Sequence, residues 1–177
     1  SFIVSEKNNF YNRLFFVEPN GDYYTYDKRH TFTLADEHLT YTSGKELLTI
    51  NFLGWKICPF ICYDLRFPVW ARNTCDYDLL IYTANWPQKR IHAWDTLLRA
   101  RAIENMAYCV GVNRTGKDDN LNQYNGHSAI YDVLGKQLTT TKYEGNFYET
   151  IILEKTHIVS ERAHFQFLSD RDHFTLN

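Results

Sequence analysis

The sequence has few of the features that mark membrane, secreted or metal-binding proteins. No apolar run approaches the length that spans a bilayer, and no charged-then-apolar leader precedes the first expected strand. The four cysteines, at positions 58, 62, 75 and 109, form no CxxC pair and show no Cys/His spacing of a zinc site. We therefore expect a cytoplasmic protein in a reducing compartment, without a disulfide framework and without a metal.

An excess of charge of one sign is also absent. The 177 residues carry a formal net charge of −2 with acids and bases interspersed, which argues against nucleic acid or a membrane surface as the partner. Aromatic residues are abundant, at 16 % with 13 tyrosines, but no RNA-recognition motif frames them, so we assign them to the core and to interfaces. The length predicts a single domain over residues 1–177.

Alternating apolar residues predict strands in the first quarter of the chain. A turn at Pro19–Asp22 favours a β-hairpin between strands at 11–17 and 23–26, after an opening strand at 2–4. Residues 31–46 are rich in turn-forming residues and are expected to form a loop.

Hydrophobic periodicity then predicts four more strands and one long helix. The strands are expected at 47–52, 55–61, 78–83 and 107–112, and the helix at 90–106. Pro59 should make the second of these strands irregular, because proline has no N–H to donate to a strand ladder. The strand–helix–strand unit should be parallel and right-handed, so the predicted fold class is α/β.

The last third of the sequence has a weaker pattern. It predicts a polar loop at 117–125, a hairpin around Leu134-Gly135 and a strand at 146–153. Residues 156–177 carry apolar side chains among charges and predict a terminal helix and an arm. We expect the arm to pack on another surface, such as that of a second subunit.

The stretch from Trp55 to Arg72 contains the strongest functional signal. An apolar run ends at Cys62, before the charged Asp64 and Arg66, and Pro68 then opens a segment expected to be a short helix. A cysteine at such a corner lies outside the core beside backbone N–H groups, where a nucleophile meets an oxyanion. The other reading of any free cysteine is a small buried hydrophobe, and we keep that reading for the remaining three cysteines.

A thiol nucleophile needs a basic or cationic neighbour, because little of it is ionised at neutral pH. His30, His38, His92 and His127 are candidates for a Cys/His dyad, but nothing in the sequence directs one of them to the corner. Lys28 is the better candidate, since it ends a strand in a polar cluster as Cys62 does. The alternative reading of Lys28 is an ordinary solvated lysine.

Five ordered motifs resemble the nitrilase, or carbon–nitrogen hydrolase, superfamily, and most of all its omega-amidase branch. The resemblance covers nearly the whole chain. The motifs are Tyr26-Asp27-Lys28-Arg29-His30, Cys62-Tyr63-Asp64-Leu65-Arg66-Phe67-Pro68, Ala84-Asn85-Trp86-Pro87, Arg99-Ala100-Arg101-Ala102-Ile103-Glu104-Asn105 and Asn113-Arg114-Thr115-Gly116.

The resemblance implies a fold and a set of catalytic roles. The fold would be an α-β-β-α sandwich, here without its N-terminal elements, in a homodimer or higher homo-oligomer. Cys62 would be the nucleophile, Lys28 and the Tyr63 N–H would stabilise the oxyanion, and Glu37 would orient the lysine. The reaction would need neither a metal nor an organic cofactor.

The resemblance also implies a substrate. It would be a small terminal carboxamide, a 2-oxoacid ω-amide such as 2-oxoglutaramate, hydrolysed through a thioester with release of ammonia. Arg66, Asn85 and Trp86 would lie near this substrate, and Arg66 could pair with its carboxylate. Arg101, together with Glu104 and Asn105, would instead make structural contacts.

One departure from the family pattern bears on activity. The general-base glutamate of the family lies before the region that Ser1–Tyr11 resembles, so we expect these 177 residues alone to turn over little or no substrate. A non-catalytic fragment or pseudoenzyme that acts as a binding module therefore stays an alternative. Another alternative is a hydrolase of nitriles or N-carbamoyl groups, which a comparison of ammonia release among substrates would distinguish.

Overall fold

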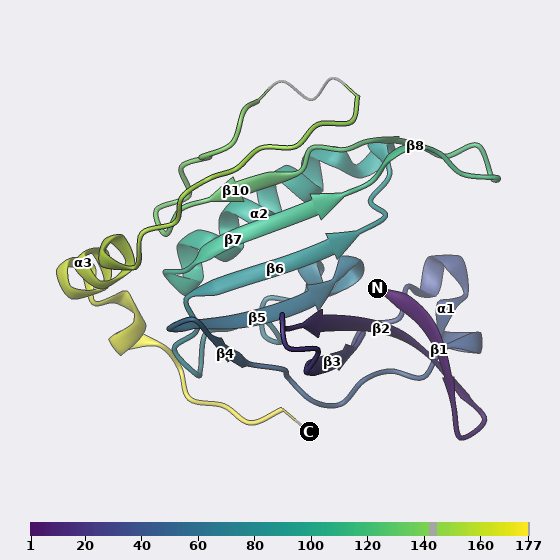
Figure 1. Cartoon of the computed structure of the whole chain (residues 1–177), viewed down its shortest axis with the longest axis horizontal. Helices are drawn as coiled ribbons and strands as arrows, with labels where there is room; N and C mark the ends of the chain where they lie inside the picture. The colour runs from purple at the N-terminus through teal and green to yellow at the C-terminus, as the bar shows by residue number, and fades with distance from the viewer. Residues whose placement is uncertain (142–144, 177) are drawn as a thin grey trace.

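The structure is a computed structural model, which describes residues 1–141 and 145–176 (Figure 1). Its α-helices are α1 (Glu37–Thr40), α2 (Ile91–Asn105) and α3 (Lys155–Phe165). Short 3₁₀ helices lie at Thr33–Ala35, Cys62–Arg66, Gln88–Arg90 and Phe167–Asp170. The strands are β1 (Phe2–Glu6), β2 (Asn9–Val17), β3 (Tyr23–Asp27), β4 (Ile50–Phe52), β5 (Trp55–Ile61), β6 (Leu79–Ala84), β7 (Tyr108–Asn113), β8 (Thr115–Lys117), β9 (Gln123–Asn125) and β10 (Ala129–Tyr131).

A five-stranded sheet in the order β10-β7-β6-β5-β4 forms the centre of the fold. Its inner strands β5, β6 and β7 are parallel, and the edge strands β4 and β10 are antiparallel to their neighbours. Helix α2 connects β6 to β7 and lies behind the sheet in Figure 1. The predicted parallel strand–helix–strand unit and the α/β class are therefore confirmed.

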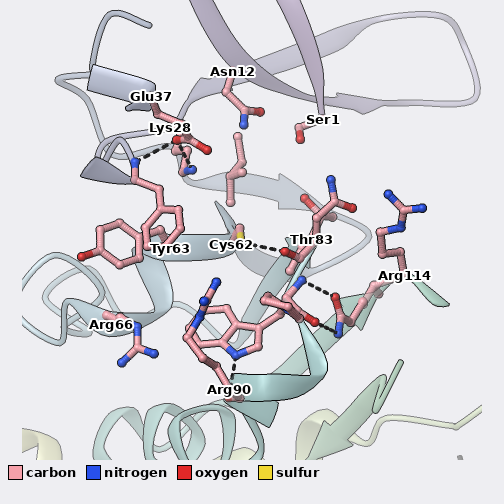
Figure 2. A pocket seen from close by; sticks show the side chains of 18 residues that line it. Ser1, Asn12, Lys28, Glu37, Cys62, Tyr63, Arg66, Thr83, Arg90 and Arg114 are labelled. Atoms are coloured by element: carbon pink, nitrogen blue, oxygen red, sulfur yellow. Dashed lines mark hydrogen bonds and ion pairs between the residues drawn. The ribbon is translucent and has the colours of Figure 1, made fainter. Parts of the chain in front are cut away.

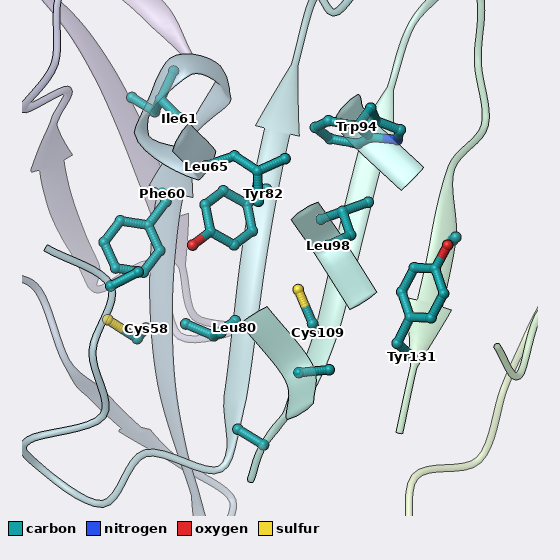
Figure 3. Packing of buried hydrophobic residues seen from close by; sticks show 14 of the residues in the cluster. Cys58, Phe60, Ile61, Leu65, Leu80, Tyr82, Trp94, Leu98, Cys109 and Tyr131 are labelled. Carbon is teal, nitrogen blue, oxygen red and sulfur yellow. The ribbon is translucent and has the colours of Figure 1, made fainter. Parts of the chain in front are cut away.

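The sheet face that α2 covers is packed with buried apolar side chains (Figure 3). The rings of Phe60 and Tyr82 stack with their centroids 5.1 Å apart. Gly111 on β7 allows the helix to approach closely, because a Cβ atom there would overlap the side chains of Leu98 and Trp94. This close packing fixes α2 against the strands whose ends carry the predicted site residues.

The antiparallel sheet β1-β2-β3 packs beside β5, and it contains the predicted hairpin at Pro19–Asp22. Tyr26 of β3 presents its ring edge-on to Phe60 at 5.7 Å. The predicted irregularity at Pro59 is wrong, since its pairing with β6 runs from Ile57 to Ile61 without a bulge. The proline is tolerated because β4 begins at Ile50, opposite Ile57, and does not reach Pro59. Pro59 therefore has a neighbouring strand, β6, on one side only.

Three other expectations fail where the pairing partner is missing or was not foreseen. The strand expected at 47–52 shortens to Ile50–Phe52, because the preceding chain turns toward β3 and the Gly44 N–H bonds to the Lys28 carbonyl. The polar loop at 117–125 is in part a hairpin, formed by β8 and β9. No strand forms over the described residues of 146–153, where Tyr148 and Ile152 are almost fully exposed.

The terminal helix is confirmed, but it and the arm that follows pack on this chain's own sheet. Ile158 of α3 is buried against Tyr108 and Val133, and the Arg162 guanidinium donates to the carbonyls of Tyr77 (2.6 Å) and Met106 (2.8 Å). Arg171 anchors the arm by donating to Asp76 at 2.7 Å. Phe167 and Phe174 of the arm stay 53 % and 39 % exposed, so its packing on a second subunit remains a prediction.

The hairpin predicted around Leu134-Gly135 is present in a short form. Only Ala129–Tyr131 is a strand, and the Gly135 N–H closes the turn onto the Asp132 carbonyl.

Among the helices of the described residues, none is long and apolar enough to cross a membrane.

Candidate active site

Cys62 stands at a sharp corner where β5 ends and the 3₁₀ helix Cys62–Arg66 begins. Its φ angle of 45° is in the left-handed region, which a side chain other than glycine adopts at a cost in strain. The predicted strand-to-helix corner is confirmed, but the helical turn starts at Cys62 itself. Residues from Pro68 onward form turns, so the helix expected there is wrong.

The carboxylate of Asp64 holds this corner in shape. It is fully buried and accepts hydrogen bonds from the Tyr26 hydroxyl (2.8 Å), the Ile61 N–H (3.1 Å) and the backbone and ring nitrogens of His30 (3.0 and 2.8 Å). A buried carboxylate with this many donors needs no further counter-ion. Asp64 thus ties β3 and the end of β5 to the turn that carries the cysteine.

Helix α2 supports the same corner from behind. The buried Arg101 donates to the Leu65 carbonyl at 2.6 Å and pairs with Glu104 at 2.9 Å. Asn105 accepts the Asn73 N–H at 2.8 Å. These contacts confirm the structural role predicted for the three polar residues of the helix.

A cavity of about 400 Å³ opens above Cys62 (Figure 2). Its size is within the range of small-molecule sites. All seven residues that the sequence nominated line it: Lys28, Glu37, Cys62, Tyr63, Arg66, Asn85 and Trp86. Their catalytic roles stay a prediction, but the chain brings them together from β3, α1 and the ends of β5 and β6.

Lys28 and Glu37 form a close ion pair at the edge of this cavity. The Lys28 Nζ lies 2.6 Å from Glu37 Oε2, and the lysine side chain is 3 % exposed. The same carboxylate oxygen accepts the Phe32 N–H at 2.8 Å, which fixes its position. A buried ammonium held by one carboxylate has further N–H donors for a ligand oxygen.

The Cys62 side chain is half-buried and lies 4.0 Å from the Asn85 carbonyl. Burial raises the pKa of this thiol, and the nearby Lys28 ammonium offsets part of that rise. The resting sulfur is therefore a thiol at neutral pH, and a base must take its proton before it attacks. Of the residues described, no histidine lines the cavity, so His30, His38, His92 and His127 form no dyad with Cys62.

The opposite wall of the cavity is shaped by a residue to which the sequence motifs gave no role. Asn113, at the end of β7, accepts the Trp86 N–H at 2.7 Å and donates to the carbonyls of Trp86 (2.9 Å) and Gly126 (2.7 Å). This amide clamps the turn after β6 in the way that Asp64 clamps the turn after β5. Its signal was its place directly after an apolar strand.

Other unforeseen side chains line the cavity as well. Among them the polar atoms Asn12 Oδ1 and Thr83 Oγ1 are buried and accept no hydrogen bond from the described residues. Arg90 and Arg114 add two cations to Lys28 and Arg66, and among the described residues Glu37 is the one carboxylate that they face. The cavity is therefore strongly cationic, which favours an anionic ligand. In the described ranges 1–141 and 145–176, no cluster of three His, Cys, Asp or Glu side chains could hold a metal ion.

Residues 1–155 match the sequence profile of the family described as carbon-nitrogen hydrolase. The chain belongs to the carbon–nitrogen hydrolase family. It is 55 % identical over 125 residues to the omega-amidase YafV of Yersinia enterocolitica, covering 71 % of this chain and 49 % of that protein. It is 37 % identical over 155 residues to the 2-oxoglutaramate amidase of Bacillus subtilis, covering 86 % of this chain and 58 % of that protein.

Solved structures of carbon–nitrogen hydrolases share the fold. A CN-hydrolase superfamily protein of Xanthomonas campestris, solved with an arsenic adduct in its active site, superposes with a TM-score of 0.94 at 40 % identity. The match covers 99 % of this chain and 69 % of that protein. The nitrilase-like fold is thereby confirmed. The chain spans about half the length of the omega-amidases that it matches.

Proposed function

We propose that the protein containing this chain hydrolyses a small terminal carboxamide, a 2-oxoacid ω-amide such as 2-oxoglutaramate. The observation that carries the proposal is the grouping of Cys62 with the Lys28–Glu37 ion pair around one cationic cavity. The substrate class is supported by the relatives, since the Yersinia protein is an omega-amidase and the Bacillus protein is a 2-oxoglutaramate amidase.

The proposed reaction passes through a thioester on Cys62. A general base takes the thiol proton, the sulfur attacks the amide carbon, and ammonia leaves after the base returns the proton. Water activated by the same base then hydrolyses the thioester to the free acid. Glu37 is the one carboxylate on the cavity among the described residues, and its pairing with Lys28 suits it to orient that lysine. The resemblance assigns the base to a glutamate outside Ser1–Asn177.

The oxyanion of each tetrahedral intermediate would be held by Lys28 and by the Tyr63 N–H. Lys28 keeps two N–H donors beyond its bond to Glu37. Tyr63 lies in the first turn of a helix, where N–H groups have no partner within the helix. Preorganised donors of this kind are commonly the largest single contribution to such a rate enhancement.

The decisive experiment measures ammonia release from 2-oxoglutaramate by the full-length protein and its Cys62→Ala variant. We expect release by the wild type and none by Cys62→Ala, while Cys75→Ala, altered at a half-buried cysteine outside the cavity, behaves as the wild type. Faster release from a nitrile or an N-carbamoyl compound would move the assignment to that bond. No release from any of the three would favour the non-catalytic binding module.

We also propose a homodimer or higher homo-oligomer. Ile103 on α2 and Val159 on α3 are apolar and largely exposed, which supports a partner for these helices. Light scattering during gel filtration tests this, and a monomer at micromolar concentration would contradict it. A reducing compartment such as the cytoplasm is proposed from the four free cysteines.

A further inference from the structure

We propose that Arg90, which the sequence motifs did not single out, is the residue that binds the substrate's carboxylate. The inference rests on the proposed function, because it assumes an amide carbon at Cys62 and an anionic group at the far end of the same molecule. Arg66 was first expected in that role. Arg66 lies in the 3₁₀ helix after β5, whereas Arg90 lies in the 3₁₀ helix after β6.

Three of the four cations on the cavity are already engaged or directed elsewhere. Lys28 is paired with Glu37 at 2.6 Å. Arg114 lies 4.7 Å over the ring of Tyr124 and donates to backbone carbonyls of its own hairpin, so it belongs to the rim. Arg66 lies 5.0 Å over the indole of Trp86, and Figure 2 shows its side chain extending away from Cys62.

Arg90 shares with Arg66 a contact to one aromatic ring, and it differs from Arg66 in the direction of its side chain. Its Cζ lies 5.2 Å from the centroid of the Phe32 ring, and in Figure 2 the side chain extends toward Cys62. Within residues 1–141 and 145–176 this guanidinium has neither a carboxylate partner nor a hydrogen bond. Stacking occupies the face of the guanidinium plane and leaves the N–H groups along its edge free.

The backbone of Arg90 is fixed in a way that suits a recognition residue. Its N–H donates to the Pro87 carbonyl at 3.0 Å, and its carbonyl accepts the indole N–H of Trp86 at 2.8 Å. Asn113 in turn clamps Trp86 at both of its backbone groups. The side chain is therefore presented from a rigid turn, which lowers the entropy lost when a ligand binds.

A free guanidinium edge in a cavity fits an oxyanion, and the oxyanion that the proposed substrate carries is a carboxylate. Carboxylates accept two parallel N–H bonds from the fork of an arginine, and such pairs add orientation as well as affinity. With the carboxylate on Arg90, the amide end of a short linear substrate is directed to Cys62 across the same cavity. Neutral amides lack this anchor, so Arg90 would set the preference for anionic ω-amides.

The test compares two substrates in one set of variants of the full-length protein. The substrates are 2-oxoglutaramate and pentanamide, a neutral amide of the same chain length. In Arg90→Gln we expect the ratio of their kcat/KM values to fall about 10- to 100-fold, mainly through KM for the anionic substrate. Arg90→Lys should keep part of the preference, because it retains the charge but not the fork.

Two matched variants separate this role from a structural one. Arg99→Gln removes an arginine that stacks on Tyr131 at 5.2 Å outside the cavity, and it should leave the ratio unchanged. An equal fall for both substrates in Arg90→Gln would overturn the inference, because a merely structural residue acts on both. A ratio that changes in Arg66→Gln and not in Arg90→Gln would also overturn it.

A binding experiment keeps this inference separate from the proposed catalytic function. In a Cys62→Ala background, titration calorimetry measures the binding of the dicarboxylate 2-oxoglutarate, which requires no turnover. We expect binding that the added Arg90→Gln change weakens by about 10-fold or more. Unchanged binding would overturn the inference, whereas a wild type that binds the anion and releases no ammonia would overturn only the proposed hydrolysis.

Discussion

The two ends of the central sheet differ in whether their cationic side chains are paired. At the amino ends of β6 and β7, the cations of α3 are all engaged: Lys155 pairs with Asp78 at 2.6 Å, and Arg162 donates to two carbonyls. At the carboxyl ends, Arg66 and Arg90 contact aromatic rings and meet no carboxylate among the described residues. The cations at the amino ends of the strands are thus paired, whereas those at the carboxyl ends are available to an anionic ligand.

This difference indicates that the amino ends of the strands contribute to stability and that the carboxyl ends form the candidate site. Paired groups at the amino ends fasten the terminal helix to the sheet and leave nothing for a ligand to bind. The carboxyl ends carry the backbone strain of Cys62 and a cavity of about 400 Å³, supported by Asp64 and Asn113. Ligands of parallel α/β sheets bind at the carboxyl ends of the strands, and the cavity of this chain lies at that end.

The largest effect is expected from Lys28→Met, at the cavity by the carboxyl ends of the strands. We expect kcat for 2-oxoglutaramate to fall about 100- to 1000-fold with a smaller change in KM, because a donor to the oxyanion is lost. Lys45→Met, at an exposed lysine outside the cavity, is the matched control. The measurement is steady-state ammonia release, with circular dichroism to show that both variants are folded. A kcat within twofold of the wild type would remove Lys28 from the mechanism.

A smaller effect, on stability alone, is expected from Arg162→Met, at the amino ends of the strands. The change leaves the carbonyls of Tyr77 and Met106 without their donor, and we expect the free energy of unfolding to fall by about 2 kcal/mol. Urea denaturation measures this. Lys155→Met, which removes a 43 % exposed side chain, should cost less than about 1 kcal/mol. The comparison fails if Arg162→Met alters the KM of the folded enzyme.

The smallest effect concerns the reactivity of Cys62. Burial raises the pKa of the thiol, so its alkylation by iodoacetamide should keep accelerating with pH above neutrality and show no plateau there. Lys28 lowers this pKa, so Lys28→Met should raise it further, reduce the thiolate fraction and slow alkylation at a given pH by less than about 10-fold. Mass spectrometry of the modified peptide follows the rate. A plateau below pH 7 would show a thiolate already formed.

The sequence was enough to nominate Cys62 as the nucleophile and Lys28 as its lysine, for a physical reason. Cys62 and Asn85 each follow an apolar strand directly, Lys28 follows the tyrosine-rich strand β3, and strand ends are visible as breaks in the periodicity of the sequence. Arg90 was missed because periodicity does not reveal the direction of a side chain that leaves a 3₁₀ turn. The fold directs it toward Cys62, while Arg66 extends away (Figure 2).

The errors in the fold have a related origin. An apolar alternation at 146–153 predicted a strand, but a strand also needs a neighbouring edge, and Tyr148 and Ile152 remain exposed instead. The hairpin of β8 and β9 was missed because its residues are polar, and its pairing depends on the backbone alone. Strand pairing is a property of two segments, so a single segment's pattern cannot decide it.

The position of Pro59 also affects how the protein resists aggregation. Beyond Ile57 the β5 edge is free of β4, and an exposed unpaired edge is where separate molecules join into fibrils, but Pro59 and Phe60 on this edge are buried. A proline at this point removes one donor from that edge, and the Tyr26 ring packs against the adjacent Phe60. The strand that leads to Cys62 can therefore end beside an open cavity without offering a template to another molecule's strand.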